Sequence, residues 1–259
     1  MSRVRRDDGF TLIELLVGIT IGTVVLLGAF TIIDQAMPAT TRIADRAAAQ
    51  GRGRTALEQI LQNLRSSVCV QQGVAPSVTY LAPIDATSTD SSLTFYSQQI
   101  AAPSGTTGTT DPAISTTFAP EKRTVQVSGA QLVETRSVGT YNAGTATWTF
   151  PSSGAGVTTR TVLANIEQDG STAYFRYFAY DAATGTLTQL NPGAGVPVGS
   201  TDAPRITRVA VAFRAGPGGN GAGTNGVDVK ARLQGNGTVQ VPVDFTSNAT
   251  AAKGPQCSF

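Results

Sequence analysis

The stretch that decides the fold is "GFTLIELLVGITIGTVVLLGAFTII", which runs from Gly9 to Ile33. From Phe10 to Ile33 it contains 24 residues and a single charge, Glu14. As an α-helix at ~1.5 Å per residue this run is about 36 Å long, and the hydrocarbon core of a bilayer is ~30 Å thick. Residues 10–33 are therefore predicted to form a transmembrane helix.

The basic residues near this run predict its orientation. Arg3, Arg5 and Arg6 precede it, and the next basic residue is Arg42. Under the positive-inside rule, residues 1–9 stay in the cytoplasm and the rest of the chain lies outside the cytoplasmic membrane. We therefore expect a single-pass protein with an extracytoplasmic domain.

Two simpler interpretations explain less of this segment. A cleaved signal peptide has an apolar core of ~7–15 residues that ends at a small-x-small site. The present run is longer, and Ala47-Ala48-Ala49 lies well past its end. A plain membrane anchor explains the length but not Glu14, because a carboxylate at mid-bilayer costs about 2–3 kcal/mol and less near the interface. Since intramembrane carboxylates usually have a partner, we expect Glu14 to have one.

The segment Gly9-Phe10-Thr11-Leu12-Ile13-Glu14-Leu15-Leu16 resembles the prepilin processing motif of type IV pilins and type II secretion pseudopilins. The resemblance implies that residues 1–9 are a leader, that prepilin peptidase cleaves between Gly9 and Phe10, and that the new amine of Phe10 is methylated. It also implies that Glu14 pairs with the cationic amine of a neighbouring subunit during filament assembly. A paired charge is tolerable in a low dielectric where a lone one is not. The alternative is an incidental carboxylate at the membrane interface.

Residues 34–68 are predicted to continue the helix and to pack it on a globular domain. Pro38 is expected to kink or interrupt the helix, and Gly51-Arg52-Gly53 is a second weak point. An apolar stripe with helical spacing follows, which suits packing against a sheet; its members are Leu57, Ile60, Leu61, Leu64 and Val68.

Residues 69–259 are predicted to form a β-rich globular domain. Alternating and β-branched runs indicate the strands, at 92–96, 124–127, 131–135, 147–150, 160–163, 174–180, 186–190, 206–214, 227–233 and 239–245. The runs 124–127 and 131–135 read as one hairpin, and the last two runs as another. The predicted fold class is therefore α+β, with one long N-terminal helix packed on a mainly antiparallel sheet.

The order of these segments carries a second resemblance. "SLTFYS", then "VLANIEQ" and "YFRYFAY", then "RITRVAVAFRAG" is similar to the minor pilins of the W type and to J-type pseudopilins. The resemblance implies a structural subunit that helps to initiate, prime or cap a type IV pilus or a type II secretion pseudopilus. It implies as partners prepilin peptidase, other pilin subunits through the helix, the membrane before assembly and the inner-membrane assembly platform. The alternatives are a pilus-tip binding module for adhesion or DNA uptake, and a major filament subunit.

Two cysteines, Cys69 and Cys257, are present in the chain. Outside the cytoplasm two cysteines tend to pair, so a disulfide is expected between the end of the helix and the C-terminal tail. Chain entropy sets its contribution to stability at ~5 kcal/mol or less. The alternative is two free thiols.

Composition argues against catalysis. The 259 residues include no histidine, which excludes Ser-His-Asp sites and His-ligated metals within this chain. The G-x-G-x-x-G match at 216–221 precedes a loop and a strand, whereas a dinucleotide site requires a helix there. The net charge is +2, and the loop 103–117 has no Lys or Arg, so nucleic-acid binding gains no support. We therefore expect no enzyme activity, no cofactor and no metal.

Overall fold

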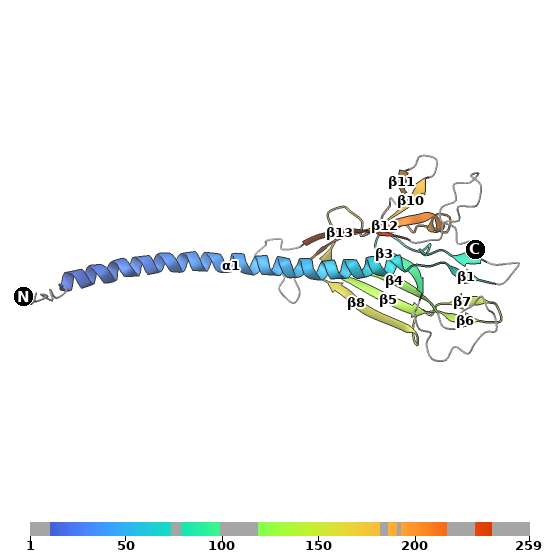
Figure 1. The fold of residues 1–259 in the computed structure, drawn as a ribbon, viewed down its shortest axis with the longest axis horizontal. Helices are drawn as coiled ribbons and strands as arrows, with labels where there is room; N and C mark the ends of the chain where they lie inside the picture. Colours follow the sequence, from blue (N-terminus) through green and yellow to red (C-terminus); the bar gives the residue numbers. More distant parts are fainter. Residues whose placement is uncertain are drawn as a thin grey trace, which may run out of the picture. The chain divides into compact units, whose positions relative to one another are not determined.

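The computed structural model of the chain describes residues 11–73, 79–98, 119–181, 186–190, 193–216 and 231–239. The chain divides into two compact units, Met1–Ala47 and Ala48–Phe259. One helix, α1 (Leu12–Arg65), contributes residues to both units. Its blue and cyan turns are seen in Figure 1. We describe each unit by itself.

Helix α1 is continuous over its 54 residues. Of the two effects expected of Pro38, a kink or an interruption, the interruption does not occur. A proline removes one backbone hydrogen bond and crowds the carbonyl four residues earlier, and the 54-residue helix tolerates this local cost. The hydroxyls of Thr40 and Thr41 donate to the carbonyl oxygen of Met37, at 2.8 and 3.3 Å. The glycines at 51 and 53 also lie inside the helix.

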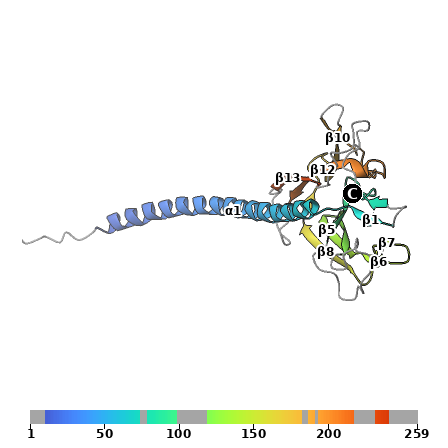
Figure 2. The same ribbon diagram turned by 45° about the vertical axis from the view of Figure 1, so that its right-hand side comes forward.

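All strand pairs in the described part of the chain are antiparallel, as predicted, but they form two main sheets. The first sheet has the order β3 (Ser92–Gln98), β4 (Pro120–Ser128), β5 (Gln131–Val138), β8 (Val157–Ala164). The second sheet has the order β11 (Thr186–Gln189), β10 (Phe175–Asp181), β12 (Ile206–Ala215), β13 (Ala231–Thr238), and β9 (Ile166–Glu167) also pairs with β12. Figure 2 shows the labelled strands of both sheets. The predicted α+β class is confirmed.

Three small elements complete the domain. Strands β1 (Val70–Gln72) and β2 (Thr79–Leu81) form one two-stranded sheet. Strands β6 (Thr140–Asn142) and β7 (Thr147–Thr149) form another. A 3-10 turn, η1 (Ala203–Arg205), leads into β12.

A single core joins the last turns of α1 to both sheets. On α1 the buried side chains are those of Ala56, Leu57, Ile60 and Leu64. Phe95 of the first sheet and Phe175 and Tyr177 of the second are fully buried in the same cluster. Val68 is not on the helix, because α1 ends at Arg65; its backbone N–H donates instead to the carbonyl oxygen of Tyr96 at 2.8 Å.

Strand β13 approaches α1 through two glycines. A Cβ placed on Gly235 would lie 2.8 Å from Cδ1 of Leu61, and one on Gly237 would lie 2.5 Å from Cδ2 of Leu64. Both glycines face inward, since Gly237 pairs with buried Val209 in the register of β12 and β13. The predicted hairpin break between Leu233 and Val239 is therefore wrong in the described residues. These glycines serve close packing rather than a turn.

The other strand predictions are largely confirmed. The hairpin of β4 and β5 turns at Gly129, whose φ of 58° suits glycine. Asp181 is the last residue of β10, one residue beyond the predicted run 174–180. Residues 227–230 and 240–245 of the predicted strands lie outside the described residues.

The chain passes from the first sheet to the second at Asn165. This residue has φ of 59°, in the left-handed region that asparagine tolerates better than most residues. Its carbonyl oxygen accepts a hydrogen bond from the N–H of Gly216 at 2.7 Å, which ties the crossing to the end of β12. The next residue, Ile166, already belongs to β9 of the second sheet.

Candidate functional site

The start of α1 holds Glu14 in its first turn. Thr11 precedes the helix, and the backbone N–H of Glu14 donates to Thr11 Oγ1 at 3.3 Å and to the Thr11 carbonyl oxygen at 3.0 Å. Thr11 is therefore the N-cap and Glu14 the third helical residue, the spacing of a capping box. A carboxylate here is also favoured by the partial positive charge of the helix start. Gly9 and Phe10 lie outside the described residues, so cleavage and methylation stay predictions.

The surface of α1 over residues 12–33 is mainly apolar and exposed. The exposed fraction is 78% for Leu12 and 62% for Phe30. The hydroxyls of Thr20, Thr23 and Thr31 donate to helix carbonyls three or four residues earlier, at 2.7–2.8 Å. These hydroxyls therefore need no water, which suits a hydrocarbon environment. Within the described residues, α1 is the one helix long and apolar enough to cross a membrane.

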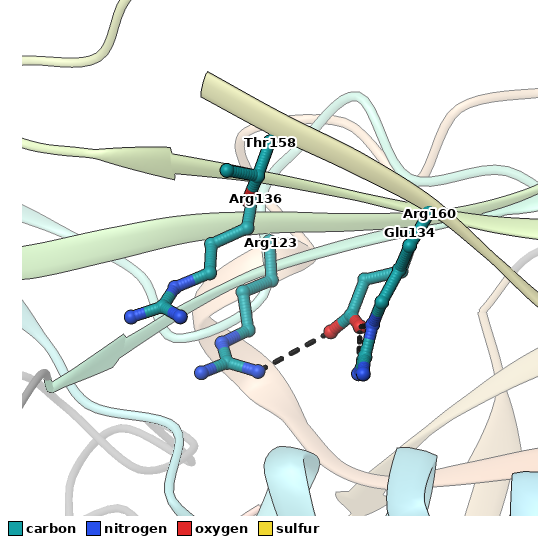
Figure 3. A pocket seen from close by; sticks show the side chains of 5 residues that line it. All are labelled: Arg123, Glu134, Arg136, Thr158 and Arg160. Carbon is teal, nitrogen blue, oxygen red and sulfur yellow. Dashed lines mark hydrogen bonds and ion pairs between the residues drawn. The ribbon is translucent and has the colours of Figure 1, made fainter. Parts of the chain in front are cut away.

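A second feature is a cluster of charged side chains on the first sheet, which we call the arginine pocket. Arg123, Glu134, Arg136, Thr158 and Arg160 line it, and its volume is ≈ 180 Å³. The register of β4, β5 and β8 places these residues on one face, because Arg123 pairs with Arg136, Arg136 with Thr158, and Glu134 with Arg160. Figure 3 shows the five side chains with α1 nearby.

Two buried carboxylates hold the arginines of this pocket. Glu121 is fully buried; its Oε2 accepts from Arg123 Nη2 at 2.9 Å and its Oε1 from Arg136 Nη2. Glu134 is 3% exposed; its Oε1 accepts from Arg123 Nη1 at 3.2 Å and its Oε2 from Arg160 Nε at 2.7 Å. Burying these charges is tolerable because each carboxylate is both paired and hydrogen-bonded.

Helix α1 also reaches this cluster. The side-chain amide of Asn63 donates to Glu134 Oε1 at 3.3 Å. With its amide oriented to satisfy both of its groups, Gln59 accepts from Arg160 Nη1 at 3.2 Å. Asn63 is therefore half-buried between the helix and the first sheet.

Asp85 forms a separate, structural ion pair at the other face of the same sheet. Its carboxylate accepts from Tyr96 Oη at 2.5 Å and from Thr87 Oγ1 at 2.6 Å, and Lys122 Nζ lies 3.1 Å away. Burial by itself raises the pKa of Asp85, but these hydrogen bonds and the Lys122 charge outweigh it and lower the pKa to about 2. Burial and the bond to Asp85 raise the pKa of Tyr96.

Cys69 lies between the end of α1 and β1, and it packs against the core. Cys257 lies outside the described residues. The Cys69–Cys257 disulfide therefore stays a prediction.

Comparison with known families bears on the N-terminal segment. Residues 4–30 match the family described as the prokaryotic N-terminal methylation motif. The chain carries the methylation motif of type IV pilin-like proteins. The match spans Gly9, Phe10 and Glu14, the residues singled out in the sequence. Together with the apolar helix, the match indicates a single-pass, membrane-anchored protein. Among curated proteins, none matches the chain significantly.

The arginine pocket was not foreseen from the sequence. Its signal was present, because "EKR" at 121–123 and "ETR" at 134–136 both place Glu and Arg two residues apart. In a strand, residues i and i+2 share a face. Two such pairs on the two strands of one hairpin therefore indicate a shared charged patch.

Proposed function

We propose that this chain is a minor pilin or pseudopilin, a structural subunit that helps to initiate, prime or cap a type IV pilus or a type II secretion pseudopilus. The observation that carries the proposal is the methylation motif at residues 4–30, which overlaps the exposed apolar start of α1 and includes Glu14. A plain anchor requires neither the motif nor the carboxylate.

The proposed mechanism is physical rather than catalytic. Prepilin peptidase removes residues 1–9 and methylates Phe10. Glu14 of one subunit then pairs with the amine of Phe10 of another, and the exposed apolar faces of the α1 helices bundle as the subunits leave the bilayer. The desolvation cost of a carboxylate in a low dielectric makes an unpaired Glu14 unfavourable, so the pair fixes the register of one subunit on the next.

The globular domain supports the minor role over the major one. It contains two main antiparallel sheets that share one core with the last turns of α1. The resemblance to W-type and J-type subunits implies a larger β-rich domain than a major pilin carries. A subunit of this kind is suited to one end of a filament, where its bulk need not repeat. The W type and the J type are the two subtypes whose segment order is similar.

The test is the copy number of this chain in sheared filaments from the native cell. The proposal predicts trace amounts beside a dominant, smaller pilin, and loss of most filaments when the chain is deleted. If this chain is instead the most abundant component, it is the major subunit. Its absence from filaments, with filament number unchanged on deletion, contradicts the proposal.

A further inference from the structure

The arginine pocket holds more positive than negative charge. Its lining has three guanidinium groups, from Arg123, Arg136 and Arg160, and one carboxylate, from Glu134. Glu121, buried beneath them, is the second carboxylate that bonds to these arginines. Three cations against two anions leave one positive charge in excess.

This excess lies on Arg136. Arg123 donates to both carboxylates, and Arg160 donates to Glu134 through two nitrogens and to Gln59. Within the part of the chain that the structure describes, Arg136 donates through Nη2 to Glu121, and its buried Nε has no hydrogen-bond partner. Arg136 also stands directly opposite Arg123 in the register of β4 and β5, and like charges opposite each other repel. An anion bound to the exposed part of the Arg136 guanidinium would balance the excess charge and weaken its repulsion with Arg123.

Solvent reaches the side of the pocket where Arg136 lies. The side chains of Arg136 and Arg160 are 37% and 54% exposed, whereas those of Arg123 and Glu134 are 18% and 4% exposed. The first two therefore form the mouth of the pocket and the second two its floor. A ligand can approach Arg136 without displacing either carboxylate.

We propose that the arginine pocket binds an oxyanion, a carboxylate or a phosphate, with Arg136 as the principal ligand. A guanidinium presents parallel N–H groups that match the two oxygens of a carboxylate or a phosphate. A metal cation or an apolar ligand has no oxygen to accept these N–H groups. The oxyanion has two possible sources: a small dissolved ion, or the acidic side chain of another protein. This proposal rests on the globular domain alone and holds whether or not the chain is a minor pilin.

The test uses the full chain in neutral detergent micelles. The thermal unfolding midpoint is followed while sodium chloride is replaced by sodium phosphate or sodium acetate at constant ionic strength. A ligand that binds only the folded state raises the midpoint. The expected result is a rise with each oxyanion in the wild type and in Arg65→Gln, which removes an exposed charge at the end of α1. In Arg136→Gln the rise should be lost.

A second variant guards against misfolding. Arg136→Lys keeps the charge and loses the fork, so its apparent affinity for phosphate should fall by roughly tenfold while the domain stays folded. An equal rise in the wild type and in both Arg136 variants, or no difference between phosphate and chloride, overturns the proposal.

A peptide separates the two sources of the oxyanion. A blocked, labelled peptide with three consecutive glutamates is titrated against the chain by fluorescence anisotropy, with a glutamine peptide as its control. If the glutamate peptide binds, the glutamine peptide does not, and phosphate displaces the bound peptide, the ligand is an acidic protein partner. A phosphate-dependent rise without peptide binding supports a small dissolved anion.

Discussion

The backbone N–H of Glu14 donates to the hydroxyl of Thr11 at 3.3 Å, so the residue expected to direct filament assembly also occupies the capping turn of α1. This contact gives Glu14 a role inside its own chain, in addition to the proposed role between subunits. The two roles are separable, because Thr11 caps the helix through its hydroxyl and Glu14 carries the charge.

The first prediction separates these roles by exchanging one group at a time. Glu14→Gln removes the charge, and Thr11→Val removes the capping hydroxyl while keeping the charge. Leader cleavage should continue in both, but incorporation of Glu14→Gln into filaments should fall by about tenfold or more, because an uncompensated amine remains in a low dielectric. The incorporation of Thr11→Val into filaments should fall far less. Incorporation is measured by immunoblot of sheared filaments, and equal losses in the two variants would assign the effect to helix capping.

The second prediction concerns the peptidase. Gly9→Ala places a methyl group at the proposed cleavage site, and the precursor should accumulate in the membrane with its leader intact. The measurement is the intact mass of the purified chain. Asp8→Ala changes the neighbouring leader residue and should be processed normally. Mature protein at the wild-type level in Gly9→Ala would remove the basis for the peptidase assignment.

The third prediction tests the close contact between α1 and β13. Gly237→Val would force its side chain against Leu64, because even a Cβ at that position lies 2.5 Å from Leu64 Cδ2. Overpacking of this kind costs about 1–3 kcal/mol of unfolding free energy. Gln234→Val, on the exposed face of β13, should change it by about 0.5 kcal/mol or less. Chemical denaturation in detergent measures both, and equal stabilities would show that the glycine contact is unimportant.

The fourth prediction follows from the low pKa of Asp85. Its pKa is about 2 in the folded chain against an ordinary 3.8, so the unfolded chain takes up this proton at a higher pH than the folded one. The stabilisation by Asp85 is therefore complete above about pH 4 and is lost as the pH falls towards 2.

Asp85→Asn removes this contribution. It should cost about 1–2 kcal/mol of unfolding free energy at pH 6, allowing for partial solvent screening, and the difference from wild type should shrink between pH 4 and 2. Asp45→Asn, an exposed site on α1, serves as the control. A difference that stays constant down to pH 2 would mean that Asp85 acts through packing rather than charge.

The fifth prediction concerns the expected disulfide. Cys69→Ser should release the C-terminal tail, which is seen as faster proteolysis near residue 250. Reductant should accelerate proteolysis of the wild type to the same rate and leave the variant unaffected. Equal protease resistance of the wild type with and without reductant would argue for two free thiols.

The helix and its motif could be predicted from the sequence because both depend on residues that are close together in the chain. The apolar stripe of Leu57, Ile60 and Leu64 repeats at helical spacing, and all three side chains are buried in the core. The prediction of a hairpin turn between residues 233 and 239 failed, although the pair Asn236-Gly237 is typical of such a turn. There, space for the leucines of α1 decides the role of the glycines, and this is a long-range contact that no local pattern contains.

The arginine pocket and the division into two sheets escaped prediction for a similar reason. Glu121, which is fully buried, lay outside the predicted strand 124–127, and charged residues are usually assigned to the solvent-exposed surface. The chain changes sheets at Asn165 through a left-handed residue, and the pairing of β12 with β9, β10 and β13 joins segments far apart in sequence. Such pairings follow from the tertiary fold.

The most direct test of the central claim is the N-terminal peptide of this chain in filaments sheared from native cells, identified by mass spectrometry. The account predicts a peptide that begins at Phe10 and carries one N-methyl group. An intact leader that begins at Met1, in a chain found only in the membrane, would contradict it and would leave α1 as a plain membrane anchor.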